Sequence, residues 1–119
     1  MPPKRVLIAD DTEFFRTALK DILSRAGYEV VGEASNGAEA IELAMTLRPD
    51  LVILDVVMPA KNGLEAARAI SALNLPLKIV MCTSLGYEPI VEEAVKAGAS
   101  GYIIKPPSES KVLAALKAL

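Results

Sequence analysis

The chain has 119 residues and no histidine, and 13 Lys and Arg against 15 Asp and Glu give it a formal charge of −2. Without histidine it lacks the most frequent general base and metal ligand, and its single cysteine excludes an internal disulfide or a cysteine-rich metal site. The mild acidity argues against nucleic-acid binding, and no apolar run approaches the roughly 18 residues of a membrane span. We therefore expect one cytoplasmic domain over residues 1–119 that binds neither nucleic acid nor membranes.

Five short apolar runs alternate with five stretches of helical spacing. The runs cover residues 6–9, 29–34, 51–54, 78–82 and 101–104 and are rich in Val, Ile and Leu, as in strands that are covered on both faces. The helical stretches carry apolar residues from Phe15 to Ala26, Ala40 to Leu47, Leu64 to Ile70, Ile90 to Ala97 and Val112 to Leu116. Five consecutive strand–helix units predict an α/β fold, in which helices cover both faces of a parallel sheet.

Capping and breaking residues indicate where some of these helices begin and end. Gly27 follows the first helical stretch, where a left-handed residue commonly ends a helix. Asn36 with Glu39 three residues later has the form of a capping box, and Pro49 prevents this second helix from continuing. The third helix is expected to begin near Asn62.

Polar residues follow four of the five apolar runs. Ligands bind beyond the carboxyl ends of the strands in such sheets, so these residues are candidates for a site: Asp10, Asp11, Asp55, Thr83 and Lys105. Acidic ends of neighbouring strands repel each other, and an all-oxygen donor set suits Mg²⁺. A lysine, a hydroxyl and a metal around one carboxylate also form the set that neutralises a phosphoryl group in transfer. Asp55 is the best candidate for a carboxylate nucleophile.

Each candidate taken alone has a simpler interpretation. Asp10 and Asp11 are consistent with charges at a helix N-terminus, and Asp55 with a strand-end turn residue. Thr83 is consistent with a cap of the fourth helix, and Lys105 with a solvated lysine. Their combined placement at the same edge of one predicted sheet favours the functional interpretation.

These residues resemble the receiver domain of two-component response regulators, most closely the stand-alone chemotaxis receivers of the CheY type. The matching segments are Val6 to Asp11, Asn36-Gly37 with Ala40, Pro49 to Leu51, Leu54-Asp55, Met58-Pro59 with Asn62-Gly63, Thr83, and Ala97 to Pro106. They follow the family's order and spacing over essentially the whole chain. The resemblance implies a flavodoxin-like, doubly wound (βα)5 fold with strand order 2-1-3-4-5, which is the order of CheY itself.

The resemblance also implies a phosphoryl-transfer site. Asp55 would accept a phosphoryl group from a phosphohistidine of a partner kinase. Asp11, Asp55 and the backbone carbonyl of Val57 would hold Mg²⁺ directly, and Asp10 would act through a bound water. Lys105 would contact the phosphoryl oxygens.

A conformational switch is implied as well. Thr83 would bind the phosphoryl group and Tyr102 would turn inward, which changes the surface of the fourth helix, fifth strand and fifth helix. That surface would signal to a protein target such as the flagellar motor switch. Val57 and Leu85 are apolar residues beside the route of an attacking water, so we expect slow self-dephosphorylation. The bond between Lys105 and Pro106 is expected to be cis.

Other functions remain open at this point. The chain is also compatible with the N-terminal receiver of a longer regulator that has a DNA-binding or enzymatic output module. A Mg²⁺-dependent phosphatase with an aspartate nucleophile often has a second acid two residues later, where this chain has Val57. A flavodoxin-like cofactor binder would bring a flavin phosphate against Asp10 and Asp11. We therefore expect a signalling switch and not an enzyme.

Overall fold

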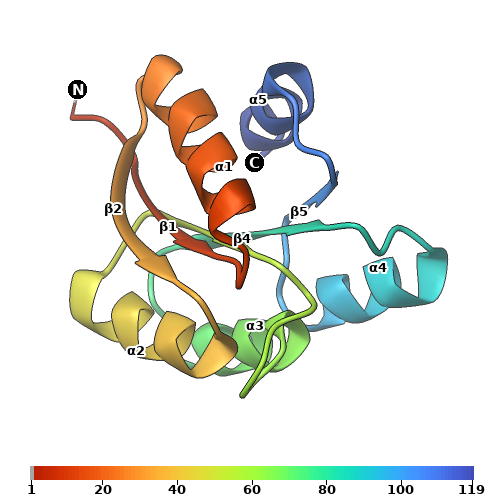
Figure 1. The fold of residues 1–119 in the computed structure, drawn as a ribbon. Coiled ribbons are helices and arrows are strands. Elements are labelled where there is room, and N and C mark those ends of the chain that lie inside the picture. The colour runs from red at the N-terminus through yellow and green to blue at the C-terminus, as the bar shows by residue number, and fades with distance from the viewer. Residues whose placement is uncertain (1) are drawn as a thin grey trace.

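The computed structural model of the chain describes residues 2–119, and in these residues five parallel strands alternate with five helices (Figure 1). The strands are β1 (Arg5–Ala9), β2 (Glu29–Ala34), β3 (Leu51–Leu54), β4 (Lys78–Thr83) and β5 (Gly101–Ile104). The helices are α1 (Glu13–Arg25), α2 (Gly37–Leu47), α3 (Gly63–Ala72), α4 (Glu88–Lys96) and α5 (Glu109–Lys117). The strand order β2-β1-β3-β4-β5 confirms the predicted flavodoxin-like fold of the CheY type.

Successive residues of the central strands enter two different apolar cores. Leu7 of β1 packs on the side of α2, α3 and α4, whereas its neighbours Val6 and Ile8 pack on the side of α1 and α5 (Figure 1). Residues of β3 and β4 alternate in the same way. Because both faces of these strands are buried, their sequences are continuously apolar and show no alternation with polar residues.

Most of the predicted helix ends are confirmed. Gly27 follows α1 with a φ of 89°, and α2 ends at Leu47, with Arg48 as its C-cap residue at a φ of 47° directly before Pro49. The Asn36 side chain accepts a hydrogen bond from the Glu39 N–H at 2.8 Å, as a capping box requires.

The reciprocal half of that capping box differs from the prediction. The Glu39 carboxylate accepts the Ser35 N–H at 2.9 Å and does not bind the Asn36 N–H, because the side chain reaches one residue further back along the chain. A complete capping box instead begins α3, where Asn62 and Glu65 each accept the other's backbone N–H. This box holds the chain just beyond the Asp55 loop.

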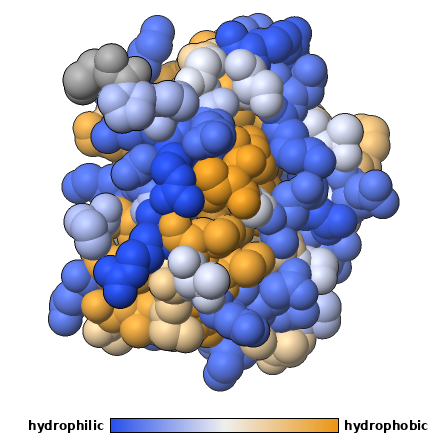
Figure 2. All heavy atoms as spheres, turned by 90° about the vertical axis from the view of Figure 1, so that its left-hand side faces the viewer, coloured by the Kyte–Doolittle hydropathy of each residue, from blue (hydrophilic) through white to orange (hydrophobic). Residues whose placement is uncertain are grey.

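The edge strand β2 is irregular. Its pairing with β1 shifts between Val30 and Gly32, so that Val31 has no partner in the ladder. Near the carboxyl end of β2, Glu33 binds Arg16 at 3.0 Å and Lys20 at 2.9 Å. On this side of the molecule an apolar area is flanked by hydrophilic side chains (Figure 2). A bulge and paired charges make an edge strand a poor template for another strand.

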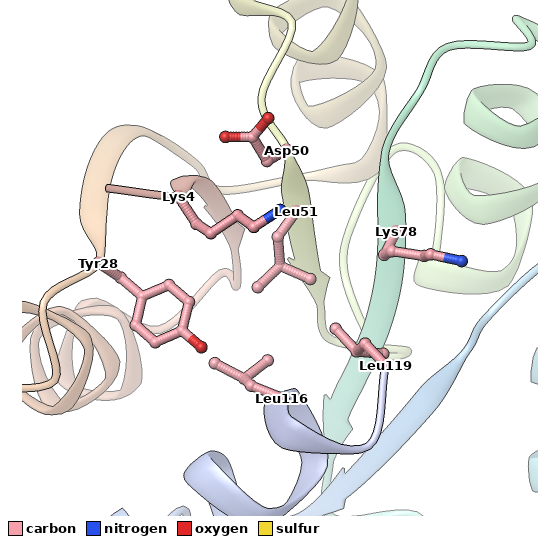
Figure 3. A pocket seen from close by; sticks show the side chains of 7 residues that line it. All are labelled: Lys4, Tyr28, Asp50, Leu51, Lys78, Leu116 and Leu119. Carbon is pink, nitrogen blue, oxygen red and sulfur yellow. The ribbon is translucent and has the colours of Figure 1, made fainter. Parts of the chain in front are cut away.

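A cavity of about 200 Å³ opens at the amino ends of the strands (Figure 3). Its lining residues are Lys4, Tyr28, Asp50, Leu51, Lys78, Leu116 and Leu119. Asp50 directly precedes β3 and Lys78 begins β4, so the cavity lies at the end of the sheet opposite to Asp55. Among the described residues, no helix has the length and apolarity needed to cross a membrane.

Candidate functional site

The sheet brings Asp10 and Asp55 side by side. Asp10 directly follows β1 and Asp55 directly follows β3, and these two strands are paired neighbours. The Asp55 N–H donates to the Ala9 carbonyl at 2.9 Å, and the Asp10 N–H donates to the Ala34 carbonyl at 2.9 Å. Both bonds continue the ladder beyond the assigned strand ends, so the two carboxylates start from rigid backbone.

The predicted acidic cluster is present in the fold. One carboxylate oxygen from each of Asp10, Asp11 and Asp55 can be chosen so that all three lie within 4.8 Å of one another. Asp10 and Asp55 are 1% and 6% exposed, whereas Asp11 is exposed to solvent. Asp10 Oδ1 accepts the Thr12 N–H at 2.9 Å, but Asp10 Oδ2 is buried and has no hydrogen-bond partner.

Lys105 balances part of this negative charge. Its Nζ donates to Asp55 Oδ2 at 2.8 Å and lies 2.7 Å from Asp10 Oδ2, where the geometry is that of an ionic contact and not of a hydrogen bond. Burial acts to lower the pKa of Lys105, but the carboxylates of Asp10 and Asp55 outweigh it, so the pKa is above its usual value. The ammonium therefore stays charged near neutral pH.

The site fits a hard divalent cation. Its donors are all oxygens, which hard divalent cations prefer, and among the described residues the buried Asp10 Oδ2 is partnered by the Lys105 ammonium alone. A single lysine against three carboxylates also leaves the cluster with excess negative charge. Val57, the predicted backbone ligand, is 57% exposed, and its N–H donates to Asp55 Oδ1 at 3.2 Å.

The two predicted switch residues both contact Leu85 in the loop between β4 and α4. Thr83 is fully buried, and its hydroxyl accepts the Leu85 N–H at 3.4 Å, a long hydrogen bond. Tyr102 is half-buried in β5, and its hydroxyl donates to the Leu85 carbonyl. Burial and the Asp55 charge raise the pKa of Tyr102, so its hydroxyl remains protonated. Thr83 does not cap α4, because Tyr87 occupies the cap position.

Two residues near the site were not assigned a role from the sequence. The ring centroid of Phe15 lies 4.0 Å from the Lys105 ammonium, although its spacing indicated only an apolar helix residue. The sequence signal for a role at the site was the place of Phe15 in the first turn of α1, which follows Asp10 along the chain. A Cβ atom on Gly63 would lie 2.0 Å from the Asp55 carbonyl oxygen, so only glycine fits beside that backbone. The predicted cis bond between Lys105 and Pro106 is present.

The sequence pattern of the response regulator receiver domain matches residues 6–117. The chain belongs to this family. Chemotaxis protein CheY of Thermotoga maritima is 49% identical to this receiver, over 95% of this chain and 94% of that protein. Transcriptional regulatory protein PdtaR of Mycobacterium tuberculosis is 44% identical over 97% of this receiver, which spans 56% of that protein.

Solved structures agree with this assignment. A CheY structure from Borrelia burgdorferi, determined in a complex with CheX, BeF3 and Mg, is 30% identical to this receiver. The two superpose with a TM-score of 0.94 over 98% of this chain and 88% of the other. The fold and the family are therefore those of a CheY-type receiver domain, and receivers of this family act as signalling switches.

Proposed function

We propose that Asp55 of this receiver accepts a phosphoryl group from a phosphohistidine of a partner kinase, with Mg²⁺ held directly by Asp11, Asp55 and the Val57 carbonyl and through a bound water by Asp10. The observation that carries this proposal is the Lys105 ammonium, which lies 2.8 Å from Asp55 and 2.7 Å from Asp10 beside the acidic cluster. Because these 119 residues contain no histidine, the phosphohistidine must lie outside them.

The transfer exchanges one bond to phosphorus for another. A carboxylate oxygen of Asp55 attacks the phosphorus atom, and the bond from phosphorus to the imidazole nitrogen breaks. The imidazole keeps the electron pair of that bond. Lys105, which donates to Asp55 Oδ2 at 2.8 Å, is suited to neutralise the phosphoryl oxygens. When bound, Mg²⁺ supplies further positive charge to the same oxygens.

The β4–α4 loop offers a route from the acceptor to the surface. A phosphoryl group adds a charge of about −1.5 to −2 and recruits hydrogen-bond donors. The Thr83 hydroxyl is a suitable donor. It accepts a long, weak hydrogen bond from the Leu85 N–H, so the proton of the hydroxyl remains free to be donated. A shift of this loop changes the acceptor of the Tyr102 hydroxyl, which is the Leu85 carbonyl.

The proposed output surface is formed by α4, β5 and α5. Three large apolar or aromatic residues are exposed there, namely Tyr87 (59%), Val95 (63%) and Ile104 (39%). Exposed apolar side chains of this size are available to contact a protein partner. We propose a protein target that responds to phosphorylation, such as a flagellar motor switch, which the resemblance to chemotaxis receivers implies.

A second candidate is the receiver of a longer regulator. The match to PdtaR supports this candidate, because this chain spans 56% of that protein. The match to the Thermotoga CheY, which spans 94% of that protein, supports the chemotaxis type. Sequencing the gene beyond the codon for Leu119 distinguishes the two. We favour the chemotaxis type because five of the first six curated relatives are named CheY.

Incubation with acetyl phosphate and Mg²⁺, followed by intact-mass measurement, tests the acceptor assignment. We expect an adduct of one phosphoryl group per chain, which is absent in Asp55→Asn and in the presence of a chelator. Asp21→Asn is the matched control, because Asp21 is exposed and paired only with Arg25 on the outside of α1. An adduct that persists in Asp55→Asn contradicts the assignment, and continuous hydrolysis of a generic phosphate ester would indicate a phosphatase.

Val57→Asn should shorten the lifetime of the adduct several-fold. Val57 is exposed at the mouth of the site, and an amide there can orient a water for attack on phosphorus. Together with the half-buried Leu85, the native valine leaves this route apolar, and we expect slow decay in the wild type. Loss of the adduct over time gives the rate. Met45→Asn on the exposed face of α2 is the control, and an unchanged rate in Val57→Asn refutes this role.

A further inference from the structure

The Lys105 ammonium has an aromatic neighbour besides its two carboxylates. Its Nζ lies 4.0 Å from the ring centroid of Phe15, well within the range of a cation–π contact. The Lys105 side chain is only 8% exposed. The ring and the carboxylates of Asp10 and Asp55 therefore make up much of the surroundings of this charge.

Phe15 is not a core residue by its packing. In the part of the chain that the structure describes, it belongs to neither of the two apolar cores, although it is half-buried. Its ring meets that of Phe14 edge to face, with centroids 5.3 Å apart and planes at 80°. Since Phe14 is 72% exposed, this second ring lies largely in solvent. The position of Phe15 is better explained by its contact with Lys105 than by a role in the core.

Asp10, which faces the Lys105 ammonium, also holds the backbone at the start of α1. Asp10 Oδ1 accepts the Thr12 N–H at 2.9 Å, and Arg16 Nη1 donates to the Asp10 carbonyl at 2.7 Å. These bonds on either side of Phe15 fix the first turn of α1 relative to Asp10. The ring is therefore placed by a rigid segment and not by a mobile loop.

We propose that Phe15 is a positioning residue for phosphoryl transfer, whose ring face holds the Lys105 ammonium beside the acceptor carboxylate. This inference rests on the proposed function of Asp55. A ring attracts a cation through its quadrupole but offers no charged or directional acceptor atom. A carboxylate or carbonyl in its place would bind an ammonium N–H and compete with the phosphoryl oxygens.

The difference between a ring and a hydrogen-bond acceptor matters because the Lys105 ammonium changes its partner during phosphoryl transfer. On phosphorylation the ammonium must leave a carboxylate oxygen for a phosphoryl oxygen, a short movement. The ring face stays attractive along such a movement as long as the ammonium remains over the face and within about 6 Å of the ring centroid. The ring also keeps water from that side of the ammonium, and a lower local dielectric strengthens the attraction between Lys105 and the phosphoryl group.

Nuclear magnetic resonance of the metal-free receiver tests the contact without any phosphorylation. The ring current of Phe15 should shift the ε-methylene signals of Lys105 upfield in the wild type. We expect this shift to be lost in Phe15→Leu, which keeps an apolar side chain, and to remain in Phe15→Tyr, which keeps the ring. Lys105 signals at the position of a solvated lysine in the wild type would overturn the proposal.

The rate of adduct formation from acetyl phosphate at saturating Mg²⁺ tests the consequence. Phe15→Leu should slow it about fivefold, a size that a partly desolvated cation–π contact supports, whereas Phe15→Tyr should stay within about twofold of wild type. Phe14→Leu is the matched control, since it removes the neighbouring ring on the same helix and should also stay within about twofold.

The outcomes separate this proposal from the proposed function. A wild-type rate in Phe15→Leu, or an equal loss in Phe15→Tyr or Phe14→Leu, overturns the positioning role while the acceptor assignment stands. A slowed Phe15→Leu with a restored Phe15→Tyr supports the role, because a purely structural defect would not be repaired by the ring alone. Absence of any adduct in the wild type overturns the proposed function and the positioning role together.

Discussion

Replacing Lys105 with Met should destabilise the metal-free receiver by about 3 kcal/mol, because it removes the cation from a buried set of carboxylates. Lys105 lies 2.7 Å from Asp10 and 2.8 Å from Asp55, and both acids are nearly inaccessible to solvent. Methionine has a similar length and no charge. The two carboxylates are then left facing each other, and one of them must take up a proton or the site must open to water.

The pKa of Lys105 decides at which pH the stabilities of the wild type and of Lys105→Met should be compared. That pKa is raised above its usual value of 10.5. A raised pKa means that the ion pair contributes its full stability below the unfolded value and loses it only as the pH rises through the folded value. Urea unfolding near neutral pH therefore measures the full contribution. Acidification does not remove the charge of Lys105.

Magnesium should reverse much of the loss in Lys105→Met. A divalent cation at the carboxylate cluster replaces the missing positive charge, so its addition should stabilise the variant more than the wild type. Lys96→Met is the control. Lys96 is 72% exposed and lies 4.0 Å from Glu93, so its loss should change the unfolding free energy by less than about 0.5 kcal/mol. Equal stability of wild type and Lys105→Met in chelator would show that the ion pair does not balance the cluster.

Gly63→Ala should also cost about 3 kcal/mol of stability and displace the acceptor. The added Cβ would lie 2.0 Å from the carbonyl oxygen of Asp55 and 2.7 Å from its carbonyl carbon. These are backbone atoms of a loop that the Gly63 N–H already binds through the Val56 carbonyl at 2.8 Å. The loop can relieve the clash only by moving, and Asp55 moves with it.

Gly86→Ala provides the matched comparison for this prediction. There the nearest atom is the terminal Cδ1 of Ile104 at 2.8 Å, which can rotate away because Ile104 is partly exposed. We expect a cost below about 1 kcal/mol. Urea unfolding measures both variants, and the rate of adduct formation reports the displacement of Asp55. If both variants lose equal stability, the close approach at Gly63 is not the cause.

The sequence predicted the fold to the level of its elements. Each apolar run became a strand and each helical stretch became a helix, since burial on both faces leaves the strands continuously apolar. The order of the strands came from the family resemblance and not from this pattern. Periodicity within one run carries no information about which strand lies beside it. The bulge at Val31 of β2 could not be predicted from the sequence for the same reason, since a bulge depends on how two strands pair.

The candidate site was predicted by position along the chain. Asp10, Asp55, Thr83 and Lys105 all follow or end strands, and parallel strands bring their carboxyl ends to one edge. The sequence could not predict the contact of Phe15 with Lys105 or the close approach of Gly63 to Asp55, although it contains all four residues. The apolar spacing of α1 described Phe15 but not the ammonium beside it.

The sequence by itself determined the chemistry available to this receiver, and the tertiary structure decided which groups meet. Three acids, a lysine and a hydroxyl predict a metal-assisted phosphoryl acceptor, and the family resemblance implies a phosphohistidine donor outside these residues. Only the packed fold brings an aromatic ring to Lys105, excludes a side chain at Gly63 and places the Lys105 ammonium against Asp10 and Asp55. These contacts join residues that are 8 to 95 positions apart, and chain spacing cannot specify the angle and distance at which packed elements meet.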